Sequence, residues 1–260
     1  MKPALGTVFW WRVALVAGAC ALWQFASGRL ISPLFVPAPL DVLSRLWALA
    51  ASGKLAFHAS YTALHAIAGF ALGAAAGTLI GVLLGRMQFL AQILDPFIMG
   101  FYSLPKIALA PLFILWFGVG TEMKVLFVAM IVFLLVFLNT YSGVRQVSRE
   151  QVTILRLMQA TEAQILRKVV LPSAITWMFT GLRLSVPYAL IGAIMGEMLA
   201  SNRGLGYVLS DATAQFDTAG AFAGIVAIIA MAVIFNTAVR IAERLAMPWR
   251  EIDAQRELSF

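Results

Sequence analysis

The chain has 260 residues, of which 62% are hydrophobic and only 12% are charged, and its mean hydropathy is +0.90. A soluble globular domain is usually about half apolar and about a quarter charged, so this composition excludes a fold whose surface is covered by water. The formal net charge of +7 would suit a nucleic-acid-binding protein, but the basic residues stand mostly between long apolar blocks rather than on one face. This arrangement is typical of membrane orientation and predicts an all-α membrane protein.

Six apolar blocks are about as long as a bilayer is thick, roughly 20 residues each, and each is predicted to form a transmembrane helix. The flanks of the first block, Lys2 and Ala26-Ser27-Gly28, would also suit a secretory signal, but Arg12 and three tryptophans inside it favour a retained helix. Most basic residues share one side with the N-terminus, so the positive-inside rule predicts cytoplasmic N- and C-termini. The predicted spans are residues 9–26, 61–85, 93–117, 124–141, 173–200 and 219–243.

The loop after the first span contains three prolines and then apolar residues at helical spacing from Asp41 onward. It is predicted to lie along the membrane surface. We therefore divide the chain into residues 1–58, the first helix with this lead-in, and residues 59–260, the main transmembrane domain. His58 and His65 near the boundary are interpreted as interfacial or packing residues rather than metal ligands. Cys20 is the only cysteine, so neither an intrachain disulfide nor a cysteine-based metal site is expected.

The second predicted span carries a glycine at every fourth position. In a helix this spacing forms one stripe without side chains, along which another helix backbone can approach closely. Two interpretations remain open, namely packing against a helix of the same chain and an interface between subunits. The glycines are Gly69, Gly73, Gly77, Gly81 and Gly85.

The third predicted span contains several prolines. Asp95-Pro96 is predicted to start a helix, with the aspartate as N-cap and the proline in the first turn. Pro105 and Pro111 then predict a kink or a break around Leu104-Pro105-Lys106. Because irregular backbone at membrane depth persists only inside protein or beside a water-filled cavity, this break is the best indication of a translocation pathway.

Charged residues inside the predicted spans are expensive in hydrocarbon, so each is a candidate functional residue. Lys106 and the adjacent Pro105 are the leading candidates to line the pathway and attract an anionic or polar solute. Arg183 is a further candidate, although snorkelling or pairing within the bundle is the favoured interpretation. Glu197, near the outer end of its span, is predicted to face either a gate or a structural partner.

Residues 148–172, here called the coupling segment, are too long for a turn and too patterned for a disordered linker. Ser148-Arg-Glu-Gln151 and Thr161-Glu-Ala-Gln164 each match a capping box and so predict two short consecutive helices. Their apolar sides would suit either a helix pair on the lipid headgroups or an element that docks in a groove of a cytoplasmic partner. Leu171-Pro172 would join the segment directly to the fifth span.

The coupling segment is also where the chain resembles a known family, the inner-membrane permeases of binding-protein-dependent ABC importers. The family signature is Glu-Ala-Ala, three residues, glycine, nine residues, isoleucine, one residue and Leu-Pro. Anchored on Leu171-Pro172, the isoleucine position holds Val169, the glycine position holds Gln159, and Thr153-Ile154-Leu155 replace Glu-Ala-Ala. A glutamine in place of the glycine costs conformational freedom in the turn between the two helices.

The resemblance extends over nearly the whole chain and is strongest to the permeases for nitrate, sulfonates, taurine, pyrimidines and flavin vitamins. Residues 103–118, 181–200, 204–207 and 248–250 resemble the corresponding stretches of that subgroup. It implies the type I importer permease fold, with six transmembrane helices and cytoplasmic coupling helices in the bacterial inner membrane. The residues expected to contact the ATPase are Arg156, Leu157, Ala160, Thr161, Glu162, Leu171 and Pro172.

The resemblance also implies partners: a second copy of the permease, two cytoplasmic ATPase subunits that bind ATP and Mg²⁺, and a periplasmic or lipid-anchored solute-binding protein. The sequence agrees that the energy comes from another polypeptide, because it contains no Gly-x-x-x-x-Gly-Lys-Ser/Thr phosphate-binding loop. We expect no catalytic residue, bound cofactor or metal ligand in this chain. An ion-coupled secondary transporter is the alternative, but it would need more buried carboxylates than the predicted spans contain.

Overall fold

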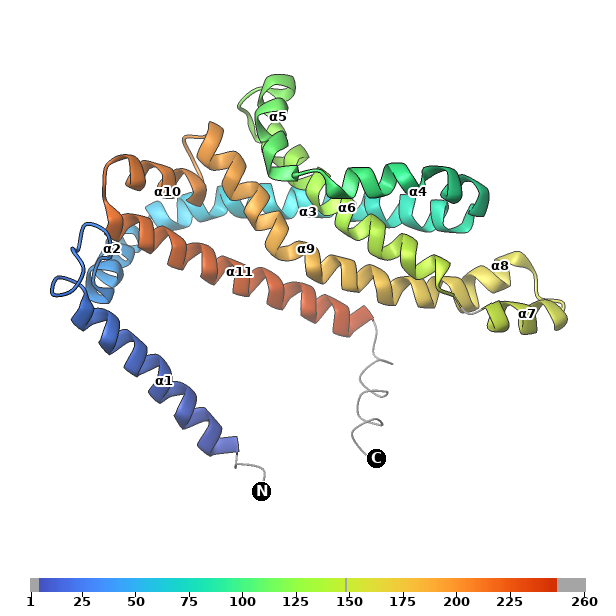
Figure 1. The fold of residues 1–260 in the computed structure, drawn as a ribbon, viewed down its shortest axis with the longest axis horizontal. Coiled ribbons are helices and arrows are strands. Elements are labelled where there is room, and N and C mark those ends of the chain that lie inside the picture. The colour runs from blue at the N-terminus through green and yellow to red at the C-terminus, as the bar shows by residue number, and fades with distance from the viewer. Residues whose placement is uncertain (1–4, 148, 247–260) are drawn as a thin grey trace. The chain divides into compact units, whose positions relative to one another are not determined.

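The computed structural model describes residues 5–147 and 149–246, and its regular elements are helices (Figure 1). Contacts divide the chain into two compact units, residues 1–61 with 202–229 and residues 62–201 with 230–260. Ser148, which begins the first predicted capping box, and residues 248–250 of the family resemblance lie outside the described residues. The elements are α1 (Leu5–Ala26), α2 (Pro39–Ala51), α3 (Lys54–Arg86), α4 (Gln88–Ser103), η1 (Lys106–Leu109), α5 (Ala110–Phe117), α6 (Thr121–Arg145), α7 (Arg149–Leu157), α8 (Glu162–Ile165), η2 (Leu166–Val170), α9 (Leu171–Ala200), α10 (Leu205–Ala214) and α11 (Thr218–Ala246).

Five of the helical segments in the described part of the chain are long and apolar enough to cross a membrane. They are α1, α3, α6, the continuous helix from Glu162 to Ala200, and α11. A sixth span forms if α4 and the η1–α5 segment are taken together, although this pair is bent by 83°. Each predicted span coincides with one of these segments, so the all-α, six-span architecture is confirmed.

In the first unit, polar contacts join α2 and the loop before it to the start of α11. Arg45 of α2 forms an ion pair with Asp217, and the Thr218 hydroxyl donates to the carbonyl of Pro33 at 3.2 Å. Burial alone would raise the pKa of Asp217, but the Gly220 N–H and the Arg45 guanidinium favour its ionised form and hold that pKa below its usual value. The proline-rich loop and α2 are therefore each anchored to the start of α11 or the residue before it.

In the second unit, the glycine stripe of α3 lies against α6. Gly69, Gly73, Gly77, Gly81 and Gly85 are all buried. An added Cβ on any of the five would come within about 3 Å of α6 atoms, and at Gly77 it would lie 2.8 Å from the Phe133 carbonyl oxygen. In this structure the stripe brings two helices of the same chain into contact, the first of the two interpretations.

Helix α9 packs on an adjacent face of α6 in a similar way. A Cβ added to Gly181 would lie 2.9 Å from Cβ of Asn139, and one added to Gly192 would lie 3.1 Å from Cδ1 of Ile131. Small-residue contacts thus bring both α3 and α9 close to α6. Weak contacts and dispersion act over such short distances, which is how helices associate where lipid competes for apolar surface.

The start of the third span differs from the prediction. Helix α4 begins at Gln88 rather than at Asp95-Pro96, and Pro96 lies inside it. Asp95 caps no helix, because its carboxylate instead accepts a 2.6 Å hydrogen bond from the Tyr141 hydroxyl and pairs with Arg145 at 3.0 Å. The predicted break at Leu104-Pro105-Lys106 is confirmed, since α4 ends at Ser103 and the chain turns before η1.

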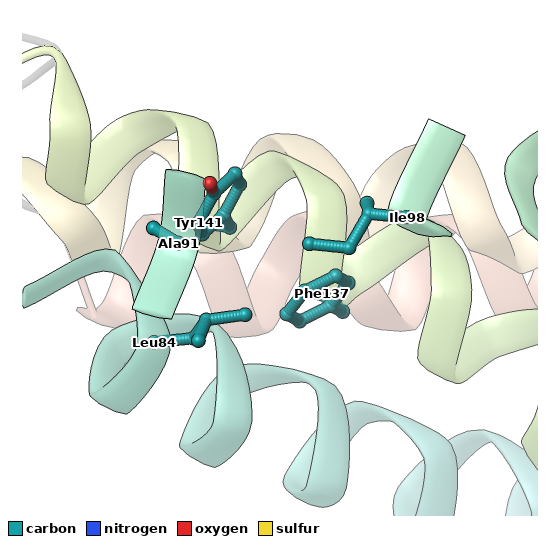
Figure 2. Close-up of a cluster of buried hydrophobic side chains, with 5 residues drawn as sticks. All are labelled: Leu84, Ala91, Ile98, Phe137 and Tyr141. Atoms are coloured by element: carbon teal, nitrogen blue, oxygen red, sulfur yellow. The ribbon is translucent and has the colours of Figure 1, made fainter. Parts of the chain in front are cut away.

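A cluster of apolar side chains holds α4 against α3 and α6, as Figure 2 shows. Leu84 comes from α3, Ala91 and Ile98 come from α4, and Phe137 and Tyr141 come from α6. The Phe137 and Tyr141 rings stack with their centroids 5.6 Å apart. This cluster buries the apolar body of Tyr141 while its hydroxyl donates to Asp95.

The α3–α6 contact yields a test with a matched control. Gly77→Ala should destabilise the protein by about 1–3 kcal/mol, because the new methyl group meets the α6 backbone and forces the helices apart. Gly100→Ala changes a helical glycine whose Cβ would meet no atom within 4 Å, so it should leave stability unchanged or raise it through helix propensity. Thermal unfolding in detergent compares the two variants, and equal melting temperatures would contradict this account of the contact.

Candidate functional site

The first half of the coupling segment is helix α7 followed by a tight turn. The N–H of Ala160 donates to the Leu155 carbonyl and the N–H of Gln159 donates to the Arg156 carbonyl, both at 2.9 Å. This pattern is a Schellman motif, which ends a helix with one residue in the left-handed conformation. That residue is Gln159, with φ of 58°, at the position where the family signature has glycine. The turn thus keeps the glycine-like conformation without the glycine.

The second half begins with the predicted capping box, which is confirmed. The Thr161 hydroxyl accepts from the Gln164 N–H at 3.3 Å, and the Gln164 side chain accepts from the Thr161 N–H at 2.8 Å. Arg156 of α7 pairs with Glu162 of α8 at 3.1 Å, but both side chains are largely exposed, so this pair contributes little stability. The capping box and the turn therefore determine the angle between the two short helices.

An apolar surface is left uncovered on α7. Leu157 is 79% exposed, and Ile154 and Met158 are also exposed, whereas Ile165 of α8 is buried. Ala160 is partly buried and Thr161 and Glu162 are exposed. The coupling segment therefore presents three large apolar side chains beside a polar rim of Arg156 and Glu162, an arrangement suited to insertion into a groove of another protein.

Helix α8 continues into α9 without a break, as Figure 1 shows. The connection is the π-helical turn η2, in which the Leu171 N–H donates to the Leu166 carbonyl five residues earlier. Pro172 follows immediately in the first turn of α9. Proline lacks an N–H and its ring clashes with the carbonyl four residues before it, so the wider π turn accommodates it. Leu171 and Pro172 thus join the coupling segment rigidly to the fifth span.

Behind the coupling segment lies a cavity of about 570 Å³. Its polar lining includes the side chains of Arg86, Arg145, Arg156, Thr153 and Glu162. The coupling segment consequently stands away from the ends of α3 and α6 instead of lying flat on them. Displacement of this segment toward the cavity would meet open space rather than packed side chains.

The pathway candidates at the broken span have local partners. Lys106 folds back over α4, where its ammonium donates to the Tyr102 carbonyl at 2.9 Å and lies 4.8 Å from the centre of the Tyr102 ring. Pro105, with its own side chain exposed, separates α4 from η1. Lys106 therefore caps the carbonyl end of α4 at the break, where backbone groups have lost their helical partners.

The other two pathway candidates are held by different helices. Arg183 of α9 forms an ion pair with Glu243 of α11, and the Glu243 side chain is almost fully buried. Glu197 of α9 is fully buried and contacts Thr62 and His65 of α3. The charged candidates therefore have separate partners within the bundle.

Sequence reasoning assigns no role to two residues that these contacts involve, Thr62 and Glu243. His65, interpreted as an interfacial or packing residue, is buried and bonded to Glu197. A signal was present in the sequence, because Thr62 and His65 are three residues apart and therefore share one face of a helix.

The left-handed turn of the coupling segment can be tested by substitution. Gln159→Gly should stabilise the turn by about 1 kcal/mol, because glycine adopts positive φ without the Cβ penalty. Hydrogen exchange of the amides at the end of α7 should slow about fivefold. Gln159→Ala, which keeps the Cβ, serves as the control and should show no slowing. Equal exchange rates in the glycine and alanine variants would exclude strain at this position.

Comparison with known proteins places these features in a family. Residues 77–248 match the model of the binding-protein-dependent transport system inner membrane component family. The putative aliphatic sulfonates transport permease protein SsuC of Bacillus subtilis (strain 168) is 33% identical over 96% of this chain and 91% of its own length. The formylaminopyrimidine transport permease protein ThiX of Halalkalibacterium halodurans is 32% identical over 88% of this chain and 92% of its own length.

A solved structure agrees in fold. A chain of the MetNI methionine ABC transporter, in an inward-facing conformation, superposes with a TM-score of 0.61 over 71% of this chain and 92% of its own. At 17% identity this likeness shows the fold alone. The family match and the extent of the SsuC relationship establish the rest: the chain belongs to the binding-protein-dependent inner-membrane components and is the permease subunit of an ABC importer.

Proposed function

We propose that this permease forms the pathway for a small polar or anionic solute and is driven by ATP hydrolysis on two separate cytoplasmic subunits. The observation that carries the proposal is the coupling segment, with an exposed apolar face on α7 and a continuous helical connection through η2 into α9. A partner that binds α7 and α8 and displaces them would move α9 with them. ATP and Mg²⁺ belong to that partner.

The proposed solute class rests on the relatives and on the charges. SsuC is named for aliphatic sulfonates and ThiX for formylaminopyrimidine, which are small and polar, and sulfonates are anionic. Lys106 at the bend of the third span and Arg183 in α9 carry positive charge within the spans. A solute-binding protein on the outer side would deliver the solute and supply most of the selectivity.

The proposed assembly contains two copies of the permease, two ATPase subunits and the binding protein. The N- and C-termini are placed in the cytoplasm of a bacterial cell, in agreement with the distribution of basic residues. This orientation puts the coupling segment in the cytoplasm, where the ATPase would be found. The pathway candidates Pro105 and Lys106 would then lie at the bend of the third span, within the bilayer.

Docking of the ATPase can be tested with two equally exposed leucines. Leu157→Glu places a charge on the apolar face of α7 and should reduce co-purification of the ATPase and ATP-dependent uptake at least about tenfold, because a carboxylate buried in an apolar interface loses its hydration. Leu245→Glu changes a leucine in the last turn of α11 that is 80% exposed, against 79% for Leu157, and should behave as wild type. Affinity purification and uptake into proteoliposomes measure both effects.

The same proteoliposomes test the energy source. Uptake by the wild-type complex should require ATP and the binding protein and should persist when a proton ionophore collapses the ion gradient. Uptake by the permease alone, driven by a proton gradient, would overturn the proposal and indicate a secondary transporter. Normal ATPase binding by the Leu157→Glu variant would show that α7 is not part of the docking surface.

A further inference from the structure

Four buried polar side chains meet at the end of α9 opposite the coupling segment, and we name this group the Glu197 node. Glu197 and Thr62 are completely buried, and His65 and Lys124 are each 2% exposed. Thr62 donates its hydroxyl hydrogen to Oε2 of Glu197 at 2.8 Å, and Nδ1 of His65 lies 2.8 Å from Oε1. Both carboxylate oxygens of Glu197 are therefore held by α3.

Lys124 extends the node from α9 to the connection between α5 and α6. Its ammonium donates to the Ala200 carbonyl at 2.8 Å, and Ala200 is the last residue of α9. It also donates to the carbonyls of Val119 at 2.8 Å and Gly120 at 3.2 Å. A Cβ added to Gly196 would lie 3.2 Å from Cγ of Lys124, so the absence of a side chain there lets the lysine stem pass.

The node therefore joins four parts of the bundle through directional bonds. Helix α3 contributes Thr62 and His65, α6 contributes Lys124, α9 contributes Glu197 and its last carbonyl, and the chain between α5 and α6 contributes two carbonyls. Apolar packing alone would also hold these helices together, and burying charges is often no more stable than an apolar alternative. What the polar bonds add is a defined position for the end of α9 relative to its three neighbours.

Helix α9 connects this node to the coupling segment. Together with α8 and η2 it forms one continuous helix from Glu162, in the coupling segment, to Ala200. At 1.5 Å per residue, Pro172 and Glu197 are separated by roughly 40 Å along the helix axis. If the coupling segment is displaced, α9 moves with it, and so does the end of α9 where the carboxylate of Glu197 is bonded to α3.

We propose that Glu197 is a positioning residue for transport, which rests on the proposed function. Through Thr62 and His65 it fixes the end of α9 to α3, beside the bond by which Lys124 joins the last carbonyl of α9 to the α5–α6 connection. Movement of the coupling segment then repositions the end of the broken span. Without the node, the ATPase still docks and hydrolyses ATP, but α9 moves without carrying the rest of the bundle with it.

The test measures solute uptake and ATP hydrolysis together in proteoliposomes that contain the permease, its ATPase and the binding protein. Glu197→Ala should lower uptake at least about tenfold while ATP hydrolysis stays within about twofold, so more ATP is consumed per solute. Glu197→Gln keeps the shape and an oxygen acceptor for Thr62, so uptake should fall only about threefold. Proportional losses of uptake and hydrolysis, or no loss of uptake, would overturn the proposal.

A pair of buried threonines gives the matched control and does not depend on replacing Glu197. Thr62→Val removes one bond of the node and should raise the ATP consumed per solute about twofold to threefold. Thr140→Val changes a threonine of α6 that is also completely buried but lies outside the node, and it should match the wild type. If the two variants consume equal amounts of ATP per solute, Thr62 has no role in coupling and the proposal is contradicted.

The wild-type protein separates this proposal from the proposed function. If wild-type uptake requires no ATP, the ATP-driven function fails and the node has no coupling role. If wild-type uptake requires ATP but the Glu197 and Thr62 variants keep the normal ratio of ATP to solute, the function stands and only the positioning role is refuted.

Discussion

The close approach of α3 and α9 to α6 is the contact on which the rest of the second unit depends. Lipid tails are as apolar as leucine, so these helices gain little from hiding apolar surface from one another and must instead make short backbone contacts. The glycines of α3 and Gly181 and Gly192 of α9 provide such contacts on adjacent faces of α6. Only with helices this near can a side chain as short as that of Thr62 bond to a carboxylate on α9.

Two lysines donate hydrogen bonds to backbone carbonyls at the ends of two helices. Wherever a helix ends at membrane depth, its last carbonyls lose their helical partners, and water is scarce there. Lys106 satisfies the Tyr102 carbonyl at the end of α4, and Lys124 satisfies the Ala200 carbonyl at the end of α9. Each ammonium is therefore part of the scaffold that keeps a helix end in place, whatever further role its charge has in transport.

Local sequence signals predicted the features that depend on neighbouring residues. The spans follow from runs of apolar residues, the break from Pro105, and the second coupling helix from Thr161 and Gln164, which lie three residues apart. The prediction that Asp95-Pro96 starts a helix is wrong, because Tyr141 and Arg145, distant in sequence, bind the carboxylate instead. The Glu197 node was not predicted for the same reason, since a single sequence does not reveal which spans lie side by side.

At the left-handed turn, the backbone conformation is present although the signature residue that usually provides it is absent. The signature position holds glutamine rather than glycine, yet the backbone adopts the conformation for which glycine is ordinarily selected. The geometry is imposed by the hydrogen bonds of Ala160 and Gln159 to α7 and by the capping box that follows. A motif search scores residue types, whereas the fold requires only that the backbone angles be reached.

The π-helical turn before Pro172 has a consequence for how such permeases can diverge. A π turn completes one turn of the helix with about one more residue than an α turn. Losing one residue between Leu166 and Val170 would therefore restore a regular α turn and leave the exposed face of α7 at the same rotation about the axis of α9. A one-residue deletion in the regular part of α9 would instead rotate the docking surface by about 100° about that axis.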